Sequence, residues 1–372
     1  MSLSMAKLQR IRDPLHNLIE FRMDNELEEH LWRVIRSQPF QRMRRIKQLG
    51  FSELVYPGAC HSRFAHSIGV FHTARQLMEV VKRAEGRAES RENRALAAAL
   101  VHDLGHGPLS HAFETVGNRL GLKLANHEDV SDLLIRDGEV ASILNEMGSG
   151  FATDVADIIK KEGQVTVHNA VVSSQFDADR LDYMRRDRLM TGSQHSAIDF
   201  TWLIANLEIA SIATGTDEQQ TGSVSTFVIG PKAIYAAEAY VLGLFQLYPT
   251  VYFHKTTRGA EKLFVELLVR LVTLTQDGSQ SNTGLSDRHP LIRFALNPND
   301  LEIVLLLDDS VVYGALSMMV EAVDPVISTL ALRLRDRKLY KCFNVRALPI
   351  SMSLVQKDLP KGSMCAQMVV SL

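Results

Sequence analysis

The sequence contains very little cysteine: three residues in 372, at positions 60, 342 and 365, with no CxxC pair. That scarcity excludes a disulfide framework and a zinc site built on cysteine pairs. Long hydrophobic runs are also missing. The best candidate, residues 239–253, spans 15 residues and includes Gln246 and Pro249, whereas a membrane-spanning helix needs about 20 apolar residues. We therefore expect no membrane partner, and a reducing cytoplasm is the predicted location.

An excess of charge of one sign is missing too. The 41 basic and 43 acidic residues leave a net charge of -2, which argues against a dedicated nucleic-acid binder while allowing local patches. The first five residues contain neither a charged segment nor an apolar one, so nothing there indicates export. The sequence is that of an ordinary globular chain.

Histidine, in contrast, is concentrated in one part of the sequence. Seven of the thirteen histidines lie between His61 and His127. Imidazole binds metals and transfers protons near neutral pH, so this clustering indicates a metal site or a proton-transfer site.

The hydrophobic pattern predicts a mainly α-helical chain. Apolar residues recur at steps of three and four over 26–207, and a helix pair is expected over 232–275. We expect an extended start at 11–21 and a β-hairpin that pairs 207–213 with 223–229. Phe245, Tyr248 and Met318-Met319 fall at helical spacing and are expected in the core.

The chain divides at a polar stretch rich in glycine and serine. Residues 276–288 are predicted to form a loop or linker. The segment before it, 1–275, is expected to form one domain with its motif region at about 60–200, and 289–372 a helical C-terminal lobe.

The strongest local signal is the adjacent pair His102-Asp103. It ends an apolar helical pattern, which Gly105, Gly107 and Pro108 then interrupt. Alone, the pair would be compatible with a helix end that carries polar caps. His66 precedes it, however, and Asp179 follows in a second polar motif, so four groups of the metal-ligand type occur in order.

This order, H…HD…D, resembles the metal-binding signature of the HD superfamily of phosphohydrolases. The flanking text resembles the deoxynucleoside triphosphate (dNTP) triphosphohydrolase branch, or dGTPase-like branch, most densely over 11–260. The matching segments are Asp13-Pro-Leu-His16, Pro39 to Gly50, Tyr56-Pro-Gly58 and His102 to His111. The resemblance implies a mainly α HD-domain helical bundle with a small β-hairpin and a helical C-terminal lobe.

By this resemblance the metal ligands are His66, His102, Asp103 and Asp179. Two imidazoles and two carboxylates suit a divalent ion, which leaves open positions for water and a phosphate oxygen. Mixed nitrogen and oxygen ligation permits Mn, Fe, Zn, Ni, Co or Mg. The implied reaction is attack of a metal-activated water on the α-phosphorus of a dNTP, which releases deoxynucleoside and triphosphate.

The resemblance also implies roles for other residues. His127 and Glu114 would be the acid/base pair, and His106 and His111 would hold phosphate oxygens. The residues that would contact the substrate are Gln48, Leu49, Arg63, Arg180, Tyr183, Asp187 and Tyr252. Relatives are usually dimers or tetramers, so a homo-oligomer is expected.

Two positions depart from the family pattern. Arg36 stands where activated relatives have a guanine-reading acid, and Leu244 stands where they have an arginine that reaches the terminal phosphate. Two alternatives therefore stay open. One is another HD activity, on a nucleoside monophosphate or on single-stranded nucleic acid. The other is a non-catalytic nucleotide or nucleic-acid binder that uses residues 30–52, which hold six basic side chains and no acidic one.

Overall fold

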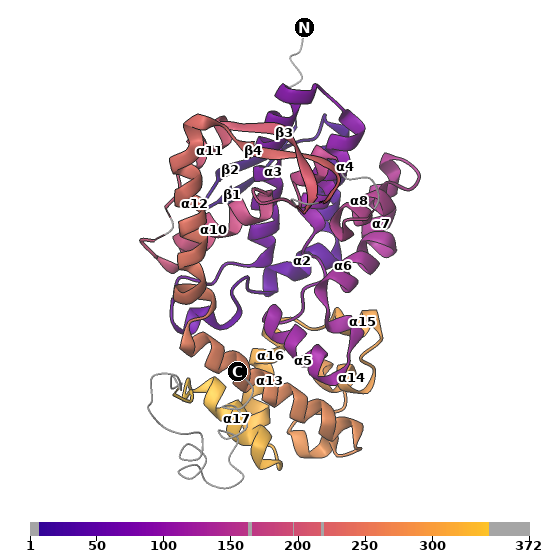
Figure 1. Cartoon of the computed structure of the whole chain (residues 1–372). Coiled ribbons are helices and arrows are strands. Elements are labelled where there is room, and N and C mark those ends of the chain that lie inside the picture. Colours follow the sequence, from indigo (N-terminus) through magenta and orange to yellow (C-terminus); the bar gives the residue numbers. More distant parts are fainter. Residues whose placement is uncertain (1–6, 163–165, 196, 217–218, 342–372) are drawn as a thin grey trace.

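The computed structural model describes residues 7–162, 166–195, 197–216 and 219–341 (Figure 1). The chain begins with a two-stranded antiparallel sheet, β1 (Leu8–Asp13) and β2 (Asn17–Arg22), paired from Leu8 opposite Arg22 to Asp13 opposite Asn17. Asp13 closes the turn between the strands, because its Oδ1 accepts the backbone N–H groups of Leu15 and His16, both at 2.9 Å.

Helices make up most of the rest, which confirms the mainly α fold. In the N-terminal body they are α1 (Glu26–Arg36), α2 (Gln38–Arg42), α3 (Arg63–Glu85), α4 (Glu89–Val101), α5 (His111–Leu120), α6 (His127–Arg136), α7 (Gly138–Leu144), α8 (Phe151–Lys160), α9 (Val167–Ala170), α10 (Ala178–Thr191) and α11 (Phe200–Ala205). Further along the chain they are α12 (Ile234–Leu247), α13 (Lys255–Gln276), α14 (Pro290–Leu296), α15 (Leu301–Val304), α16 (Asp309–Val320) and α17 (Pro325–Arg335). A π-helical turn at Tyr248–Tyr252 separates α12 from α13.

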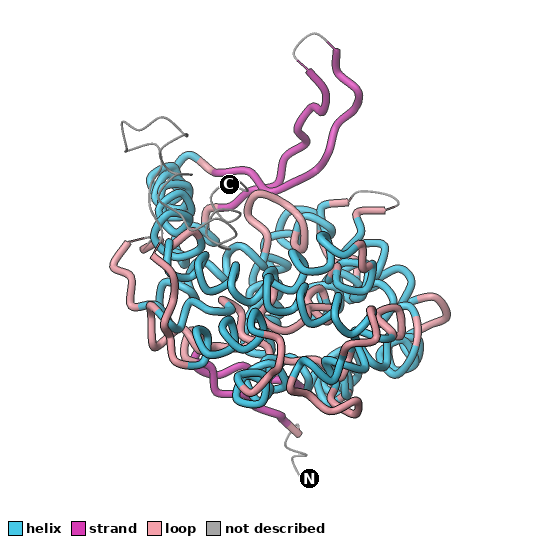
Figure 2. Tube along the Cα trace, turned by 90° about the horizontal axis from the view of Figure 1, so that it is seen from below, coloured by secondary structure: helices cyan, strands magenta, loops and turns pink. Residues whose placement is uncertain are grey.

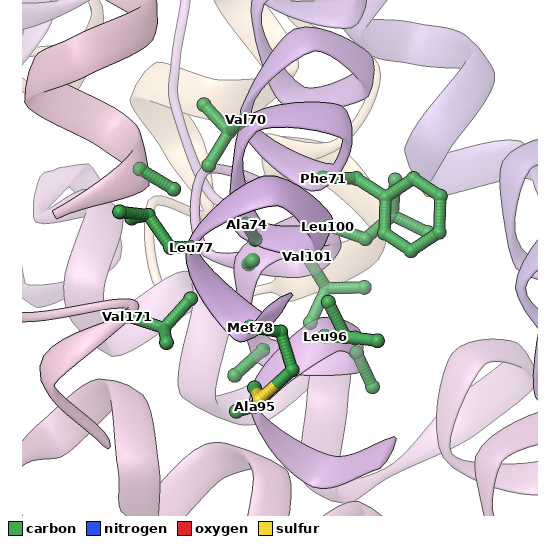
Figure 3. Packing of buried hydrophobic residues seen from close by; sticks show 14 of the residues in the cluster. Val70, Phe71, Ala74, Leu77, Met78, Ala95, Leu96, Leu100, Val101 and Val171 are labelled. Atoms are coloured by element: carbon green, nitrogen blue, oxygen red, sulfur yellow. The ribbon is translucent and has the colours of Figure 1, made fainter. Parts of the chain in front are cut away.

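The first hydrophobic core surrounds α3, the longest helix of the N-terminal body. Figure 3 shows Phe71 of α3 beside Leu100 of α4, and Met78 of α3 beside Ala95 and Leu96 of α4. The small side chains of α4, including a fully buried Ala98, leave room for close approach of the two helices. His66 and the His102-Asp103 pair therefore lie near the ends of two tightly packed helices.

A second core joins α13 to α14, α16 and α17 and also includes α5. In Figure 1 these helices form the lower part of the molecule. Within 276–288 the chain makes one helical turn at Gln280–Thr283, and Thr283 and Leu285 are buried. Helix α13 belongs to this second core. The division at 275 stays a prediction, and residues 342–372 of the expected C-terminal lobe lie outside the described residues.

The expected β-hairpin is confirmed. Strands β3 (Leu207–Thr216) and β4 (Gln219–Ile229) pair antiparallel, from Leu207 opposite Ile229 outward, with an irregularity at Thr214 and Gly215. Figure 2 shows that the outer part of this hairpin projects from the helical body. Among the described residues, no helix combines the length and apolar character that a membrane crossing requires.

One part of the expected core is wrong. Phe245 is 71% exposed, Tyr248 is 43% exposed and Met318 is 42% exposed, whereas Met319 is buried as expected. Helix α12 is apolar around most of its circumference, so periodicity could not tell which of its apolar faces would be covered by the rest of the chain.

Candidate metal and catalytic centre

Three helices bring the four predicted metal ligands together. His66 lies in the first turns of α3, His102 caps the C-terminus of α4 with Asp103 next to it, and Asp179 lies in the first turn of α10. Ser62 begins α3 by accepting the N–H of Ala65, and Asp177 begins α10 by accepting the N–H of Arg180. Such side-chain caps satisfy backbone donors at helix starts, so local sequence fixes where both helices begin.

The ligand atoms of these residues converge. His66 Nε2 lies 3.0 Å from Asp179 Oδ1 and 3.7 Å from Asp103 Oδ2. His102 Nε2 lies 3.4 Å from Asp103 Oδ1 and 3.7 Å from Asp179 Oδ1. One donor atom each from His66, His102 and Asp103 fall within 4.8 Å of one another.

The hydrogen bonds of the two histidines leave Nε2 available to a cation. Each ring uses Nδ1 for a hydrogen bond: His66 with Asp182 Oδ2 at 2.9 Å, and His102 with the carbonyl of Ala99 at 3.0 Å. Neither buried Nε2 atom makes a hydrogen bond in the described part of the chain. Buried polar atoms normally have partners, and a ligand histidine typically donates its other N–H to a carboxylate or carbonyl. The residues therefore fit a divalent metal ion.

Charge in this cluster favours a cation. Burial opposes the ionised form of Asp103, but Arg63 and His102 hold the pKa of this carboxyl well below its usual range. For His66, burial also opposes the charged form, yet the nearby carboxylates of Asp179 and Asp182 raise its pKa to about 10. A proton thus occupies the cluster when no metal does, and metal binding has to displace it.

A second group of side chains lies beside the first. His127 Nδ1 is hydrogen-bonded to Glu114 Oε1, and His111 Nδ1 lies 2.9 Å from Glu114 Oε2. The rings of His106 and His127 stack, with centroids 3.9 Å apart. His106 Nε2 is also 3.3 Å from Asp103 Oδ1, so this histidine links the two groups.

The environment sets different protonation states within this second group. Burial, Arg63 and His127 together hold the pKa of His106 well below 6.5, so its ring is neutral at pH 7. Burial opposes ionisation of Glu114, but hydrogen bonds from His111 and His127 lower its pKa below the usual range. A neutral imidazole and an ionised carboxylate therefore stand next to each other.

Both groups border one cavity of about 470 Å³. Its wall contains most of the residues predicted for substrate and catalysis, namely Gln48, Leu49, Arg63, Asp103, His106, His111, His127, Asp179, Tyr183, Asp187 and Tyr252. His66, His102 and Glu114 are not among the lining residues, and Glu114 is hydrogen-bonded to His127 and His111, which are. On the far side, Tyr252 donates its hydroxyl to Asp187 Oδ2 at 2.8 Å, and His61 Nε2 lies 2.9 Å from Asp187 Oδ1.

Two sequence expectations find less support here. Arg180 does not line the cavity, because its guanidinium is bound to Asp177 and to the carbonyl of Ser174. In the basic stretch 30–52, three of the six cations are paired with carboxylates: Arg33 with Glu146, Arg45 with Asp308, and Lys47 with Glu53. Two others donate to neutral groups, Arg42 to the carbonyls of Leu307 and His106 and Arg44 to the side chain of Gln41.

The structure adds three residues to which the sequence gave no place in the site: Tyr248, Phe253 and Glu261 line the cavity. Arg258 lines it as well, and its Nη1 donates to Glu261 at 2.6 Å. The missed signal is the aromatic segment 248–253 directly before a helix start, which turns α13 against the site. Beneath the metal ligands, Asp182 connects His66 to His16 and Arg186.

Comparison with known proteins agrees with this geometry. The family model of the HD domain matches residues 63–185. The chain is 33% identical over 334 residues to the uncharacterized protein YwfO of Bacillus subtilis, covering 89% of this chain and 70% of that protein. A solved phosphohydrolase from Bacteroides thetaiotaomicron superposes with a TM-score of 0.77 at 30% identity, covering 94% of this chain and 82% of that one.

A deoxynucleoside triphosphate triphosphohydrolase, the SAMHD1 homolog of Dictyostelium discoideum, is 30% identical over 251 residues. That match covers 65% of this chain but only 46% of the relative, and the chain spans about half of several other curated relatives. The chain belongs to the HD superfamily of phosphohydrolases, in a group related to the dNTP triphosphohydrolases. It is accordingly a hydrolase.

Proposed function

We propose that the protein is a metal-dependent dNTP triphosphohydrolase that releases deoxynucleoside and triphosphate. One observation carries the proposal: Asp103 and Asp179 of the predicted metal cluster and His127, which Glu114 holds, line the same cavity, and His106 joins the two groups by its 3.3 Å approach to Asp103. The name of the Dictyostelium relative supports the same substrate class.

A divalent ion held by His66, His102, Asp103 and Asp179 would lower the pKa of a bound water and neutralise charge on the phosphate. The chain itself supplies the proton transfer. Glu114 holds the Nδ1 side of His127, which leaves Nε2 to exchange a proton with the 5′ oxygen of the departing deoxynucleoside. Neutral His106 offers one hydrogen bond to a phosphate oxygen, as does the more exposed His111.

Sugar and phosphate contacts follow from the cavity wall. Asp187 already accepts the Tyr252 hydroxyl and is held by His61, so the tyrosine ring is fixed where a deoxyribose would pack. Gln48 and Leu49 face the same space, and Gln48 Oε1 is buried without a hydrogen-bond partner among the described residues. We assign these residues to sugar recognition, and Arg63 to a phosphate oxygen.

The test is hydrolysis of each dNTP in the presence of Mn²⁺, Mg²⁺, Fe²⁺ or Co²⁺, with products resolved by chromatography. We expect deoxynucleoside and tripolyphosphate, and loss of both products in the double variant His102→Ala/Asp103→Ala. The matched control is His195→Ala/Asp287→Ala, which changes the same residue types at exposed positions away from the cavity. Orthophosphate or pyrophosphate as the only phosphate product would contradict the proposal.

A second candidate is another HD phosphohydrolase activity, on nucleoside monophosphates or single-stranded oligonucleotides. Leu244, at the position of the family's phosphate-binding arginine, packs against the first hydrophobic core. One charged phosphate contact is worth about 1.5 to 3 kcal/mol, so its loss weakens the preference for triphosphates. Including both substrate classes and ribonucleotides in the same panel separates these activities.

We also propose that copies of the chain associate through α12. Its outer face exposes Tyr235 (83%), Val241 (61%), Leu242 (55%) and Phe245 (71%), and Glu238 is the only charged side chain among the described residues that line the groove there. Contiguous apolar surface of this kind is typical of protein interfaces. The cytoplasmic location and a nucleic-acid partner at 30–52 stay predictions.

A further inference from the structure

The turn between β1 and β2 is connected to the metal centre by buried polar side chains. His16 Nε2 lies 2.7 Å from Asp182 Oδ1, and the other oxygen of Asp182 lies 2.9 Å from Nδ1 of His66. His16 is thus two hydrogen bonds away from a predicted metal ligand, although the two residues are 50 positions apart in the sequence.

A buried ion pair completes this connection. Arg186 donates to Asp182 through Nε at 2.7 Å and through Nη2 at 3.1 Å, and to Asp13 through Nη1 at 2.8 Å. Asp13 is the residue whose carboxylate closes the β1–β2 turn and so places His16. None of these four side chains is more than 4% exposed.

The Asp182–Arg186 pair packs against α3 with no free space between them. On α3, three residues after His66, Gly69 faces the pair: a Cβ atom there would lie 2.1 Å from Asp182 Oδ1 and 2.2 Å from Arg186 Nη2. Real Cβ contacts are never that short, so the carboxylate and the guanidinium rest directly on the backbone of the helix that carries His66. Asp182 is therefore held on one side by contact with the α3 backbone at Gly69 and on the other by hydrogen bonds with His16 and Arg186.

We infer that His16, Asp13, Asp182 and Arg186 are positioning residues, which together orient the imidazole of His66 and so set the affinity and geometry of the metal site. Asp182 accepts the Nδ1–H of His66, which fixes the tautomer that presents the Nε2 lone pair. His16 and Arg186 saturate Asp182 so that it does not turn away.

The inference rests on the metal site of the proposed function and is independent of the substrate. It predicts that His16→Leu, which keeps the volume but removes the donor, weakens Co²⁺ and Mn²⁺ binding to the metal-free full-length protein by roughly 10- to 100-fold. The visible absorption bands of bound Co²⁺ should shift as well, because the ring of His66 changes orientation. His16→Gln places an amide nitrogen near the former Nε2 and should restore most of the affinity and the original Co²⁺ spectrum.

The matched control is His72→Leu. The ring of His72 lies 4.9 Å from that of His16, but His72 Nδ1 accepts a hydrogen bond from Arg75 instead of contacting Asp182. We expect metal affinity in this variant to stay at the wild-type value. Calorimetric titration, Co²⁺ absorption and thermal unfolding of the metal-free variants separate a change in metal binding from a general loss of stability.

Should His16→Leu fail to fold, Asp13→Asn provides the second test. Asparagine keeps an oxygen for the turn but loses the charge that holds Arg186, so a smaller loss of affinity in the same direction is expected. Wild-type affinity and spectrum in a folded His16→Leu or Asp13→Asn protein would overturn the inference, as would an equal loss in His72→Leu. None of these readouts requires hydrolysis, so an inactive protein with altered metal binding would contradict only the proposed substrate.

Discussion

At the scale of single residues, the site depends on where each polar atom finds a partner. His66 and His102 each use one ring nitrogen within the protein and keep the other for a ligand. Arg63 is bound to Asp103 and to Ser110 Oγ, the latter at 2.9 Å, so its charge is directed at the metal side of the cavity. Identical side chains on the surface would have water as a partner and ordinary pKa values.

Glu114 gives a prediction at this scale. Replacing it with glutamine removes the carboxylate that holds His127, and we expect kcat to fall roughly 10²- to 10⁴-fold, the usual contribution of an acid/base group. The pKa of Glu114 is lowered by its histidine partners. The carboxylate is charged above this pKa and loses its charge only as the pH falls through it. Protonation of Glu114 should therefore cause no loss of activity near neutral pH.

The measurement is the pH profile of kcat for wild type and Glu114→Gln, together with metal content as the control. An unchanged kcat with normal metal content would exclude Glu114 from the proton transfer. A fall in metal content equal to the fall in rate would instead place its role at the metal site.

At the scale of secondary-structure elements, helix ends and one glycine decide the geometry. The caps at Ser62 and Asp177 fix the starts of α3 and α10, and α4 ends at the His102-Asp103 pair. Gly69 lets Asp182 and Arg186 lie against α3. Because these helices are held by a common core, a shift of one of them would separate the metal ligands.

Gly69→Ala should therefore lower the stability of the protein, although helix propensity alone predicts that alanine would raise it. In an open helix interior, alanine stabilises relative to glycine by about 1 kcal/mol. At Gly69 the added methyl would displace the buried ion pair, and the free energy of unfolding should fall by about 3 kcal/mol. Gly314→Ala in α16 is the matched control, because a Cβ atom there meets nothing within 4 Å.

Chemical denaturation of both glycine variants in the metal-free state gives the comparison. We expect a lower denaturation midpoint for Gly69→Ala and an equal or higher one for Gly314→Ala. A stabilised Gly69→Ala protein would show that the contact with Asp182 and Arg186 relaxes at little cost.

At the scale of the whole molecule, α16 is hydrogen-bonded to the loop between α4 and α5, which contains Asp103 and His106. Asp309 of α16 accepts the backbone N–H groups of Leu109 at 2.7 Å and Lys47 at 2.9 Å. Arg42 joins the carbonyl of His106 to that of Leu307. Leu109 and Ser110 both have positive φ angles (59° and 57°), which are uncommon for residues other than glycine, and the hydrogen bond of Leu109 to Asp309 helps to hold this turn.

The exposed face of α12 gives the prediction for the whole molecule. Replacing Leu242 and Phe245 with glutamate would place charges in the apolar groove, so we expect the oligomer to dissociate into folded monomers. Sedimentation velocity and circular dichroism report mass and fold. Glutamate at Leu133 and Leu189, two leucines exposed elsewhere to a similar degree, is the control. An unchanged mass for the α12 variant would exclude this face as the interface.

The helical class, the β-hairpin and the membership of the family could all be predicted without coordinates, because they depend on periodicity, turn residues and ordered motifs. The sequence also named the side chains of the metal cluster, since ligand type and order are visible without coordinates. Their roles in binding and catalysis stay predictions.

Which atoms meet is a property of the three-dimensional fold. It placed Tyr248 at the cavity, paired most of the basic stretch with acids and carbonyls, and joined His16 to His66 across the fold. It also left the outer face of α12 exposed, where periodicity predicted core. The physical reason is that burial and charge pairing depend on contacts between residues distant in the chain, which local patterns do not contain.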